Sequence, residues 1–255
     1  MPQHSKDSPS ELFSWQSQDY LHHRPTYPRE LYQWIASLTP SHQLALDCAA
    51  GSGQAACGLA EYFQWVIATD MSINQLIAAH PHQRVCYVTA PAEVQPFQAK
   101  LFDIITAACA VHWFDRAQFY LEVKRLLKPK GIIAVWTYSW PELNQPQLDK
   151  LLMQLKDDIL GEYWQPQSYL YFNKYNDLEF PFKSINAPPF TISIQWSADD
   201  LLKFLNTWSA AKRYRQVKKI DSITHIKEEF NSVWRAVFST PVVEINLPLY
   251  LKVGY

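Results

Sequence analysis

A short apolar run that ends in a glycine-containing turn is the feature that most constrains this chain. The run ends at Asp47-Cys48, and Ala49-Ala50-Gly51-Ser52-Gly53 then leads into a helical pattern that begins at Gln54. Two of the six glycines stand here, one residue apart. Glycine permits sharp turns and close approach of the backbone to a ligand, and a helix N-terminus offers free N–H groups and a positive dipole end. The stretch therefore predicts a strand, a turn and a helix around a ligand site.

Strand and helix patterns alternate on both sides of this turn. Short apolar runs predict strands at 44–48, 65–69, 84–88, 101–107 and 132–137. Helical spacing predicts helices at 29–38, 54–63, 73–80 and 116–127. Asp115 with Gln118 makes a capping box for the last of these helices. Nearly continuous apolar runs suit parallel strands that are buried on both faces, so the alternation predicts a doubly wound, Rossmann-like parallel sheet.

The alternation breaks after the fifth predicted strand. Residues 138–190 contain one clear helical pattern, at 147–159, and then a stretch rich in proline and aromatic residues, which indicates an insertion on the acceptor side of the sheet. Further elements are expected after it: a strand at 191–196, helices from 198 and at 223–238, and a last strand at 242–253. We expect one domain over 1–255, with a loose tail at 1–18, a ligand-binding core at 19–137 and a seven-stranded, mostly parallel sheet whose last strand is antiparallel.

Charge and cysteine content argue against several classes of protein. The formal net charge of -1 does not favour nucleic acid or an anionic membrane as a partner. A basic run at 212–219 is better explained as a solvated helix face than as an RNA contact. The four cysteines form no Cys-x-x-Cys pair and have no histidines at ligand spacing, so we expect reduced thiols and no metal. No secretory or membrane-spanning pattern occurs, and a cytoplasmic protein is expected.

The glycine turn alone leaves two kinds of ligand open. Gly51-x-Gly53-x-x-Ala56 also fits the relaxed dinucleotide fingerprint, and Asp70, at the end of the second strand, would suit the ribose of a nicotinamide cofactor. Asp47 lies beside the turn and would repel a pyrophosphate, which favours a ligand with an amino group. Ala92-Glu93 and the aromatic stretch 107–115 follow the third and fourth strands, where ligands bind such sheets.

Six motifs stand along residues 19–137 in one order. They are Tyr20-x-x-x-Arg24-Pro25-x-Tyr27-Pro28, Asp47-Cys48-Ala49-Ala50-Gly51-Ser52-Gly53-Gln54, Ala68-Thr69-Asp70-Met71-Ser72, Ala92-Glu93, His112-Trp113-Phe114-Asp115 and Leu126-Leu127-Lys128-Pro129-Lys130-Gly131. Together they resemble the class I S-adenosylmethionine-dependent methyltransferases of the type 11 group, nearest the trans-aconitate methyltransferase-like branch. The resemblance implies methyl transfer from S-adenosylmethionine, with S-adenosylhomocysteine as the product. Ala49 departs from the family pattern, which usually has glycine there.

The resemblance also implies which residues hold the cofactor. The turn would cradle the methionine part with Asp47 near its ammonium, Asp70 would bind the ribose hydroxyls, and Met71 would pack on the adenine. The full implied set of cofactor-binding residues is Asp47, Ala49, Gly51, Gly53, Gln54, Asp70, Met71, Ala92, Glu93 and Cys109. Tyr20 and Arg24 resemble the N-terminal segment that folds over the cofactor in this group.

Methyl transfer from a sulfonium is an in-line displacement, for which alignment and exclusion of water can supply most of the rate. His112 is the candidate base if the acceptor must lose a proton; the alternative is a rim histidine hydrogen-bonded to backbone. A carboxylate acceptor needs no base, and Tyr20 or Arg24 would then hold the anion. The candidate acceptor pocket consists of aromatic residues: Trp113, Trp136, Tyr138 and Trp140, with Tyr163, Trp164, Tyr169, Tyr171 and Phe172 of the insertion as further candidates.

Two other functions stay open at this stage. One is a nicotinamide-dependent oxidoreductase, and the other is a cofactor-binding protein without catalysis. The expected partner is a small-molecule acceptor. The sequence does not identify that acceptor, the atom that is methylated or the oligomeric state, for which a monomer is one option.

Overall fold

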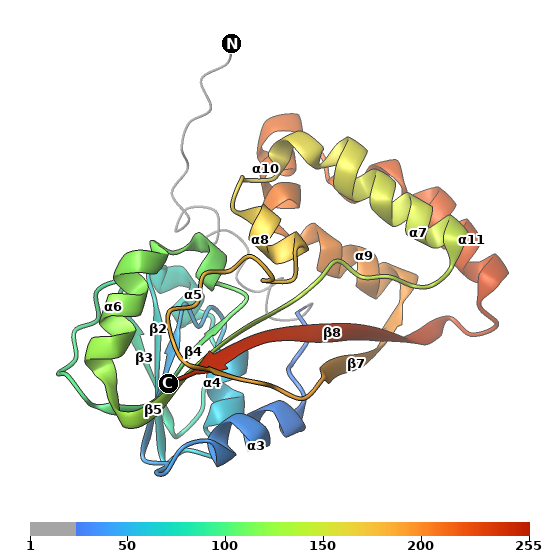
Figure 1. The fold of residues 1–255 in the computed structure, drawn as a ribbon. Coiled ribbons are helices and arrows are strands. Elements are labelled where there is room, and N and C mark those ends of the chain that lie inside the picture. Colours follow the sequence, from blue (N-terminus) through green and yellow to red (C-terminus); the bar gives the residue numbers. More distant parts are fainter. Residues whose placement is uncertain (1–23) are drawn as a thin grey trace.

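The computed structural model describes residues 24–255 (Figure 1). At its centre lies an eight-stranded sheet in the order β3-β2-β1-β4-β5-β8-β6, with β7 paired to β8. The strands are β1 Leu44–Cys48, β2 Trp65–Asp70, β3 Val85–Thr89, β4 Phe102–Ala108, β5 Leu127–Tyr138, β6 Ser184–Ile185, β7 Phe190–Ser197 and β8 Val242–Gly254. The prediction of seven strands is therefore wrong by one, because the two-residue β6 is too short to give a sequence pattern.

The first five strands form the parallel half of the sheet, as predicted. Strand β1 lies between β2 and β4, with Asp47 opposite Ala68 on one side and Thr106 on the other. The strand order reverses at this point, and the carboxyl ends of β1, β2, β3 and β4 meet at one edge. Ligands of doubly wound sheets bind at such a switch point. The last strand, β8, is antiparallel to β5, which confirms the prediction for it.

The helices between these strands begin where the sequence predicts, but two of them end early. Their bounds are α3 Arg29–Ser37, α4 Gln54–Leu59, α5 Ile73–Ile77 and α6 Arg116–Leu126. Helix α4 ends at Leu59, and Phe63, predicted to end it, is buried in the turns before β2. Helix α5 ends at Ile77, three residues short of the predicted His80, where the following Pro81 disfavours helical backbone. Strand β5 starts five residues earlier than predicted, since a register shift between Phe102 and Ile104 lets Leu127 pair with β4.

Half of the predicted capping box at α6 is present. The Asp115 side chain accepts a hydrogen bond from the backbone N–H of Gln118 at 3.2 Å. The reciprocal bond, to the backbone N–H of Asp115, comes from Glu93 Oε1 at 3.0 Å. Glu93, from the loop after β3, therefore accepts the hydrogen bond that the side chain of Gln118 would accept in a capping box.

The second half of the chain adds a group of helices beside the sheet (Figure 1). Its α-helices are α7 Pro146–Met153, α8 Ser168–Phe172, α9 Ala198–Asn206, α10 Ser209–Lys218 and α11 Lys227–Val237, and α7 continues as the π-helix η2 Gln154–Ile159. Helix α10 includes most of the basic run at 212–219, but Lys212 and Tyr214 are buried, so only part of that run is a solvated face. The helix predicted at 223–238 is broken at Ile226.

Side chains alternate between two apolar clusters, one on each face of the parallel strands. Ala134 and Trp136 of β5 face the cluster that includes α3 and α4, whereas Ile133 and Val135 face the cluster that includes α6. All four cysteines are free thiols. Within residues 24–255, no helix is long and apolar enough to span a bilayer, and no group of three potential metal ligands occurs.

Candidate cofactor and acceptor pockets

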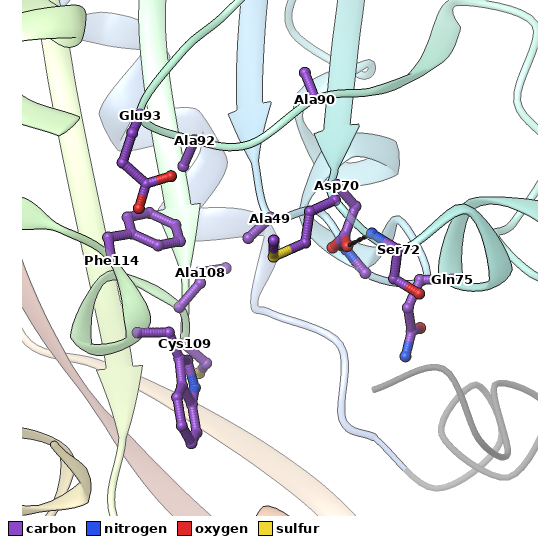
Figure 2. Close-up of a pocket in the computed structure, with 14 residues that line it drawn as sticks. Ala49, Asp70, Ser72, Gln75, Ala90, Ala92, Glu93, Ala108, Cys109 and Phe114 are labelled. Atoms are coloured by element: carbon purple, nitrogen blue, oxygen red, sulfur yellow. Dashed lines mark hydrogen bonds between the residues drawn. The ribbon is translucent and has the colours of Figure 1, made fainter. Parts of the chain in front are cut away.

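A pocket of about 190 Å³ lies at the carboxyl ends of the parallel strands (Figure 2). It contains seven of the residues predicted to bind the cofactor: Ala49, Gly51, Asp70, Met71, Ala92, Glu93 and Cys109. Its other lining residues are Ser72, Gln75, Ala90, Ala108, Ala110, Trp113 and Phe114. Ser72 belongs to a motif quoted above and four others to the stretch 107–115, with Trp113 expected on the acceptor side, so the sequence failed to indicate only Gln75 and Ala90. Ala90 directly follows β3, so a wider window around that strand end would have found it.

Gly53 and Gln54 do not line this pocket. Gly53 has a φ of 85° and directly precedes α4, and a side chain at this position would clash with the hydroxyl of Tyr87. That hydroxyl is held in place because it donates to the carbonyl of His80 at 2.7 Å. Gln54 accepts a hydrogen bond from the Ser52 hydroxyl at 2.7 Å. Both residues thus shape the turn, and Gly53 is required there by backbone geometry and by Tyr87.

Two lining residues that are not glycine adopt left-handed backbone conformations. Ala49 follows β1 with a φ of 53°, and Cys109 follows β4 with a φ of 52°. Such a conformation costs an L-residue about 1–2 kcal/mol. The conformation of Ala49 explains why a glycine would be suited to this position. The backbone strain at Ala49 and Cys109 lies at the ends of two adjacent strands and borders the pocket. Such strain is often found at binding sites.

Asp70 is anchored at the end of β2 by two backbone groups. Its Oδ2 accepts from the N–H of Gly51 at 3.0 Å, and its Oδ1 accepts from the N–H of Ser72 at 2.8 Å. Burial raises the pKa of the carboxyl, while these two hydrogen bonds oppose the shift. Each oxygen keeps further accepting capacity, and Figure 2 shows the side chain facing the pocket. The arrangement suits a ligand with neighbouring hydroxyl groups.

Asp47 lies behind the pocket lining rather than in it. Its side chain is completely buried, and its Oδ1 accepts the hydroxyl of Thr106 at 2.7 Å. Its Oδ2 has no hydrogen-bond partner among the described residues. Burial raises the pKa of this carboxyl to about 7. Asp47 is therefore separated from the pocket by its lining residues, and its role beside a ligand's ammonium stays a prediction.

A second, smaller pocket of about 60 Å³ adjoins the first. Its lining residues are Arg24, Cys109, His112, Trp113, Trp164, Ser168, Tyr171, Trp208 and Ser209. Cys109 and Trp113 line both pockets, so the two spaces meet at these residues. The far wall comes from the insertion and from the start of α10, and it includes Trp164 and Tyr171, two of the predicted insertion aromatics. Tyr20 lies outside the described residues.

Arg24 supplies a fixed positive charge to the second pocket. Its guanidinium donates to the hydroxyl of Tyr138 at 2.7 Å and to the carbonyl of Thr207 at 3.4 Å. It also lies over the rings of Phe204 and Trp208, 5.3 Å and 5.7 Å from their centres. Cation–π contacts of this kind stabilise and orient an arginine. The guanidinium is therefore positioned before any ligand arrives.

Three of the four aromatic residues first expected in the acceptor pocket pack elsewhere. Trp136, Tyr138 and Trp140 belong to the apolar cluster on one face of the sheet, and none of them lines either pocket. Alternation along β5 does place Trp136 and Tyr138 on one face, as predicted, but the helices cover that face. Tyr138 acts on the site through Arg24, whose position it fixes. Trp113 lines both pockets, as described above.

His112 lies in the second pocket as a buried, neutral imidazole. Its Nδ1 makes a hydrogen bond of 2.9 Å with the hydroxyl of Tyr175, whereas the alternative to a catalytic role had a backbone partner. Burial, with a smaller contribution from Arg116, lowers its pKa to about 3. A histidine with so low a pKa is a weak proton acceptor. Its contact with Tyr175 makes it suitable for orienting a ligand rather than for removing a proton.

The second pocket contains hydrogen-bond donors that lack acceptors. The hydroxyl of Tyr171 and the indole N–H of Trp208 are buried without a partner among the described residues. Burial holds the pKa of Tyr171 well above its usual value, so the hydroxyl keeps its proton. A buried donor without a partner costs about 1–3 kcal/mol. A ligand that brings oxygen acceptors to these groups, beside Arg24, would recover that energy.

The chain resembles known proteins along almost its whole length. A family described as a methyltransferase domain matches residues 46–135. A methyltransferase of Dictyostelium discoideum is 29% identical over 92% of this chain and 91% of its own length. An uncharacterized methyltransferase of Schizosaccharomyces pombe is 25% identical over 93% of this chain and 92% of its own length. A solved structure from Anaeromyxobacter dehalogenans, designated a type II methyltransferase, is 35% identical, with a TM-score of 0.79 over 91% of this chain and 97% of that one. The chain therefore belongs to the methyltransferase family with a Rossmann-like fold.

Proposed function

We propose that this methyltransferase transfers a methyl group from S-adenosylmethionine to a small carboxylate. The observation that supports the proposal most is the junction of the two pockets at Cys109 and Trp113. One pocket offers groups for a nucleoside, and the other offers a cation and hydrogen-bond donors. Two ligands that occupy these spaces would meet at the junction, which is the arrangement that an in-line displacement requires.

The first pocket fits S-adenosylmethionine in the chemistry of its lining. The anchored carboxylate of Asp70 is suited to accept hydrogen bonds from the ribose hydroxyls. Met71, Ala92 and Phe114 give apolar surface for an adenine ring. Asp47 lies behind the lining with one oxygen unpartnered among the described residues, and in its ionised form it would favour a ligand with an ammonium group. When bound, the cofactor supplies a methyl group on a sulfonium, and the chain's own residues align it and exclude water.

The second pocket favours an anionic oxygen nucleophile. Arg24 contributes the positive charge. Tyr171 and Trp208 contribute an O–H and an N–H that can donate hydrogen bonds to the acceptor. Charge-assisted hydrogen bonds to a carboxylate are about twice as strong as neutral ones. A carboxylate is already deprotonated at neutral pH, so the low pKa of His112 is no obstacle. The resemblance to the trans-aconitate methyltransferase-like branch points to the same acceptor class.

Titration calorimetry and a methyl-transfer screen test this function. We expect S-adenosylhomocysteine to bind and NAD not to bind, whereas binding of NAD alone would favour an oxidoreductase. With labelled S-adenosylmethionine, we expect product from a panel of small carboxylic acids and none from the corresponding amides. Binding without any product from the panel or from a metabolite extract would instead favour a cofactor-binding protein without catalysis.

A further inference from the structure

The loop after β3 forms one wall of the first pocket but has little backbone structure of its own. Ala90, Ala92 and Glu93 line the pocket from this loop. Residues 91–97 belong to no helix or strand, and the N–H of Val94 makes a single local bond, to the carbonyl of Pro91 at 3.3 Å. Since a loop of this kind does not hold its own shape, the position of the wall depends on contacts from elsewhere.

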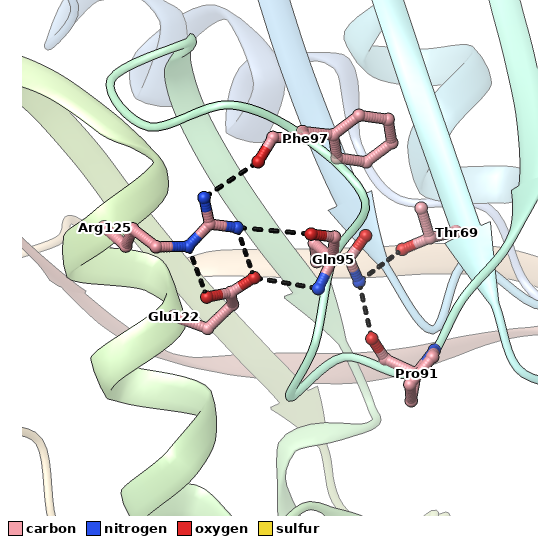
Figure 3. A network of polar contacts seen from close by, with 6 residues as sticks. All are labelled: Thr69, Pro91, Gln95, Phe97, Glu122 and Arg125. Carbon is pink, nitrogen blue, oxygen red and sulfur yellow. Dashed lines mark hydrogen bonds and ion pairs between the residues drawn. The ribbon is translucent and has the colours of Figure 1, made fainter.

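An ion pair on α6 binds the backbone of this loop directly (Figure 3). Arg125 pairs with Glu122 through two short contacts, of 2.6 Å and 2.7 Å. The Oε1 of Glu122 accepts from the N–H of Gln95 at 2.8 Å. Arg125 donates to the carbonyls of Gln95 at 3.2 Å and Phe97 at 2.8 Å. The pair thus satisfies both backbone polar groups of Gln95, and it does so with charge-assisted hydrogen bonds.

Gln95 carries this connection on to the sheet. Its side-chain amide is buried and donates to the hydroxyl of Thr69 at 3.1 Å and to the carbonyl of Pro91 at 2.8 Å. Thr69 directly precedes Asp70, the residue expected to hold the ribose. The loop is therefore fixed relative to both α6 and the end of β2, which are the two elements on either side of the nucleoside part of the pocket.

A second contact attaches the loop to the beginning of the same helix. Glu93 accepts the N–H of Asp115, the residue after Phe114, and Phe114 lines the pocket opposite Asp70. Figure 2 shows Glu93, Ala92 and Phe114 together on one side of the pocket. The loop is thus held at the N-cap of α6 and again by Glu122 and Arg125 further along the helix, so any tilt of the loop would change the width of the first pocket.

We propose that Gln95, Glu122 and Arg125 are positioning residues that set the affinity for the nucleoside part of the cofactor. None of the three lines the pocket, so each acts through the loop. The inference rests on the proposed function, because it assigns the width of the first pocket to the adenosyl group of S-adenosylmethionine. It predicts a loss in cofactor affinity that is separate from any loss in methyl-transfer rate at saturation.

Arg125→Met, with Lys128→Met as its matched control, tests this proposal. Lys128 lies three residues further on and also pairs with an acid, Asp103, at 2.9 Å, but that pair binds the N-terminal end of β1. We expect Arg125→Met to weaken binding of both S-adenosylhomocysteine and adenosine by about tenfold. The rate at saturating S-adenosylmethionine should stay within about twofold of the wild-type rate, so that KM rises and kcat does not. Lys128→Met should destabilise the fold and leave both affinities within about twofold.

Hydrogen exchange separates failure of this proposal from failure of the proposed function. Arg125→Met should accelerate exchange at the amides of 94–97 by about tenfold, and Lys128→Met should not. Gln95→Met, which keeps the ion pair, is the second variant in case Arg125→Met does not fold. If wild-type protein binds no S-adenosylhomocysteine, the proposed function fails and this inference falls with it. If the wild type binds and Arg125→Met or Gln95→Met binds equally well, or no worse than Lys128→Met, only the positioning role is overturned.

Discussion

The backbone N–H of Gly51 donates to Oδ2 of Asp70 over 3.0 Å, which joins the turn after β1 to the last residue of β2. Strands β1 and β2 are adjacent and parallel, and both residues line the first pocket. A carboxylate that accepts backbone hydrogen bonds is oriented without using its remaining lone pairs. One side chain therefore shapes the turn and presents acceptors to the ligand.

Asp70→Asn should weaken binding of S-adenosylhomocysteine by about tenfold or more, because an amide nitrogen replaces one of the two acceptor oxygens. The substitution also disturbs one of the hydrogen bonds from Gly51 and Ser72, so the melting temperature should fall. Titration calorimetry and thermal unfolding measure the two effects. An unchanged affinity would contradict the role proposed for Asp70 at the ribose.

Ala49→Gly should leave the free energy of unfolding unchanged or raise it by up to about 1 kcal/mol, because glycine relieves the left-handed backbone strain at a φ of 53°. The matched control is Ala236→Gly on the exposed face of α11, where the same exchange should cost about 0.5–1 kcal/mol. Urea denaturation measures both. Equal destabilisation by the two substitutions would show that the conformation of Ala49 is not strained.

Asp47→Asn should change the pH dependence of stability. The folded-state pKa of Asp47 is about 7, above that of an unfolded aspartate, so the folded protein retains this proton more tightly. Its contribution to the free energy of unfolding therefore decreases as pH rises from about 4 to about 7 and is constant above that range. Relative to wild type, the variant should gain stability over this interval, by an amount on the order of 4 kcal/mol. Denaturant titrations of both proteins at about pH 4 and pH 8 measure the difference, and parallel curves would be inconsistent with a buried Asp47 whose pKa is raised.

Trp208→Phe should raise the KM for a carboxylic acid acceptor by about fivefold to tenfold, because it removes an N–H donor from the second pocket. Trp140→Phe is the matched control: its indole N–H is also buried without a partner among residues 24–255, but it does not line the pocket. Affinity for S-adenosylhomocysteine should change in neither variant. Similar KM values for the two variants would argue against a donor role for Trp208.

His112 should not titrate in the physiological range. Its folded-state pKa of about 3 lies below the unfolded value, so it costs no stability above about pH 6.5 and destabilises the fold as pH falls from there toward 3. The pH profile of kcat should therefore show no histidine limb between about pH 6 and pH 8, and His112→Gln should reduce kcat by less than about tenfold. Ring-proton NMR signals of His112 that shift with an apparent pKa near 6.5 would contradict this assignment.

The parallel half of the sheet and its ligand-binding edge follow from local patterns in the sequence. Apolar runs ending in Asp47, Asp70 and Ala107 identify the strands, and parallel strands bring such ends to one edge. Alternation along β5 also places Trp136 and Tyr138 on the same face. Periodicity does not reveal whether that face is open or covered, and the helices that cover it belong to another part of the chain.

Several side chains of the second pocket can be predicted from the sequence, but their assembly into one space and the ion pair on α6 cannot. Tyr171 and Trp208 meet through tertiary packing of an insertion without strong periodicity against a later helix. Glu122 and Arg125 stand three residues apart on a helix, and in sequence they resemble an ordinary surface pair. Their proposed role depends on hydrogen bonds to the backbone of the loop after β3. The spacing of side chains in the sequence does not predict backbone partners.

The two pockets are built from separate parts of the chain, and this has a consequence for engineering new activities. Residues before 115 supply the whole lining of the first pocket, whereas the insertion and the start of α10 form the far wall of the second. Exchanging residues 139–183 and 198–218 between homologues would therefore replace the acceptor wall and retain the donor site. Such chimeras offer a direct route to altered substrate scope, with Cys109 and Trp113 as the fixed boundary between the two modules.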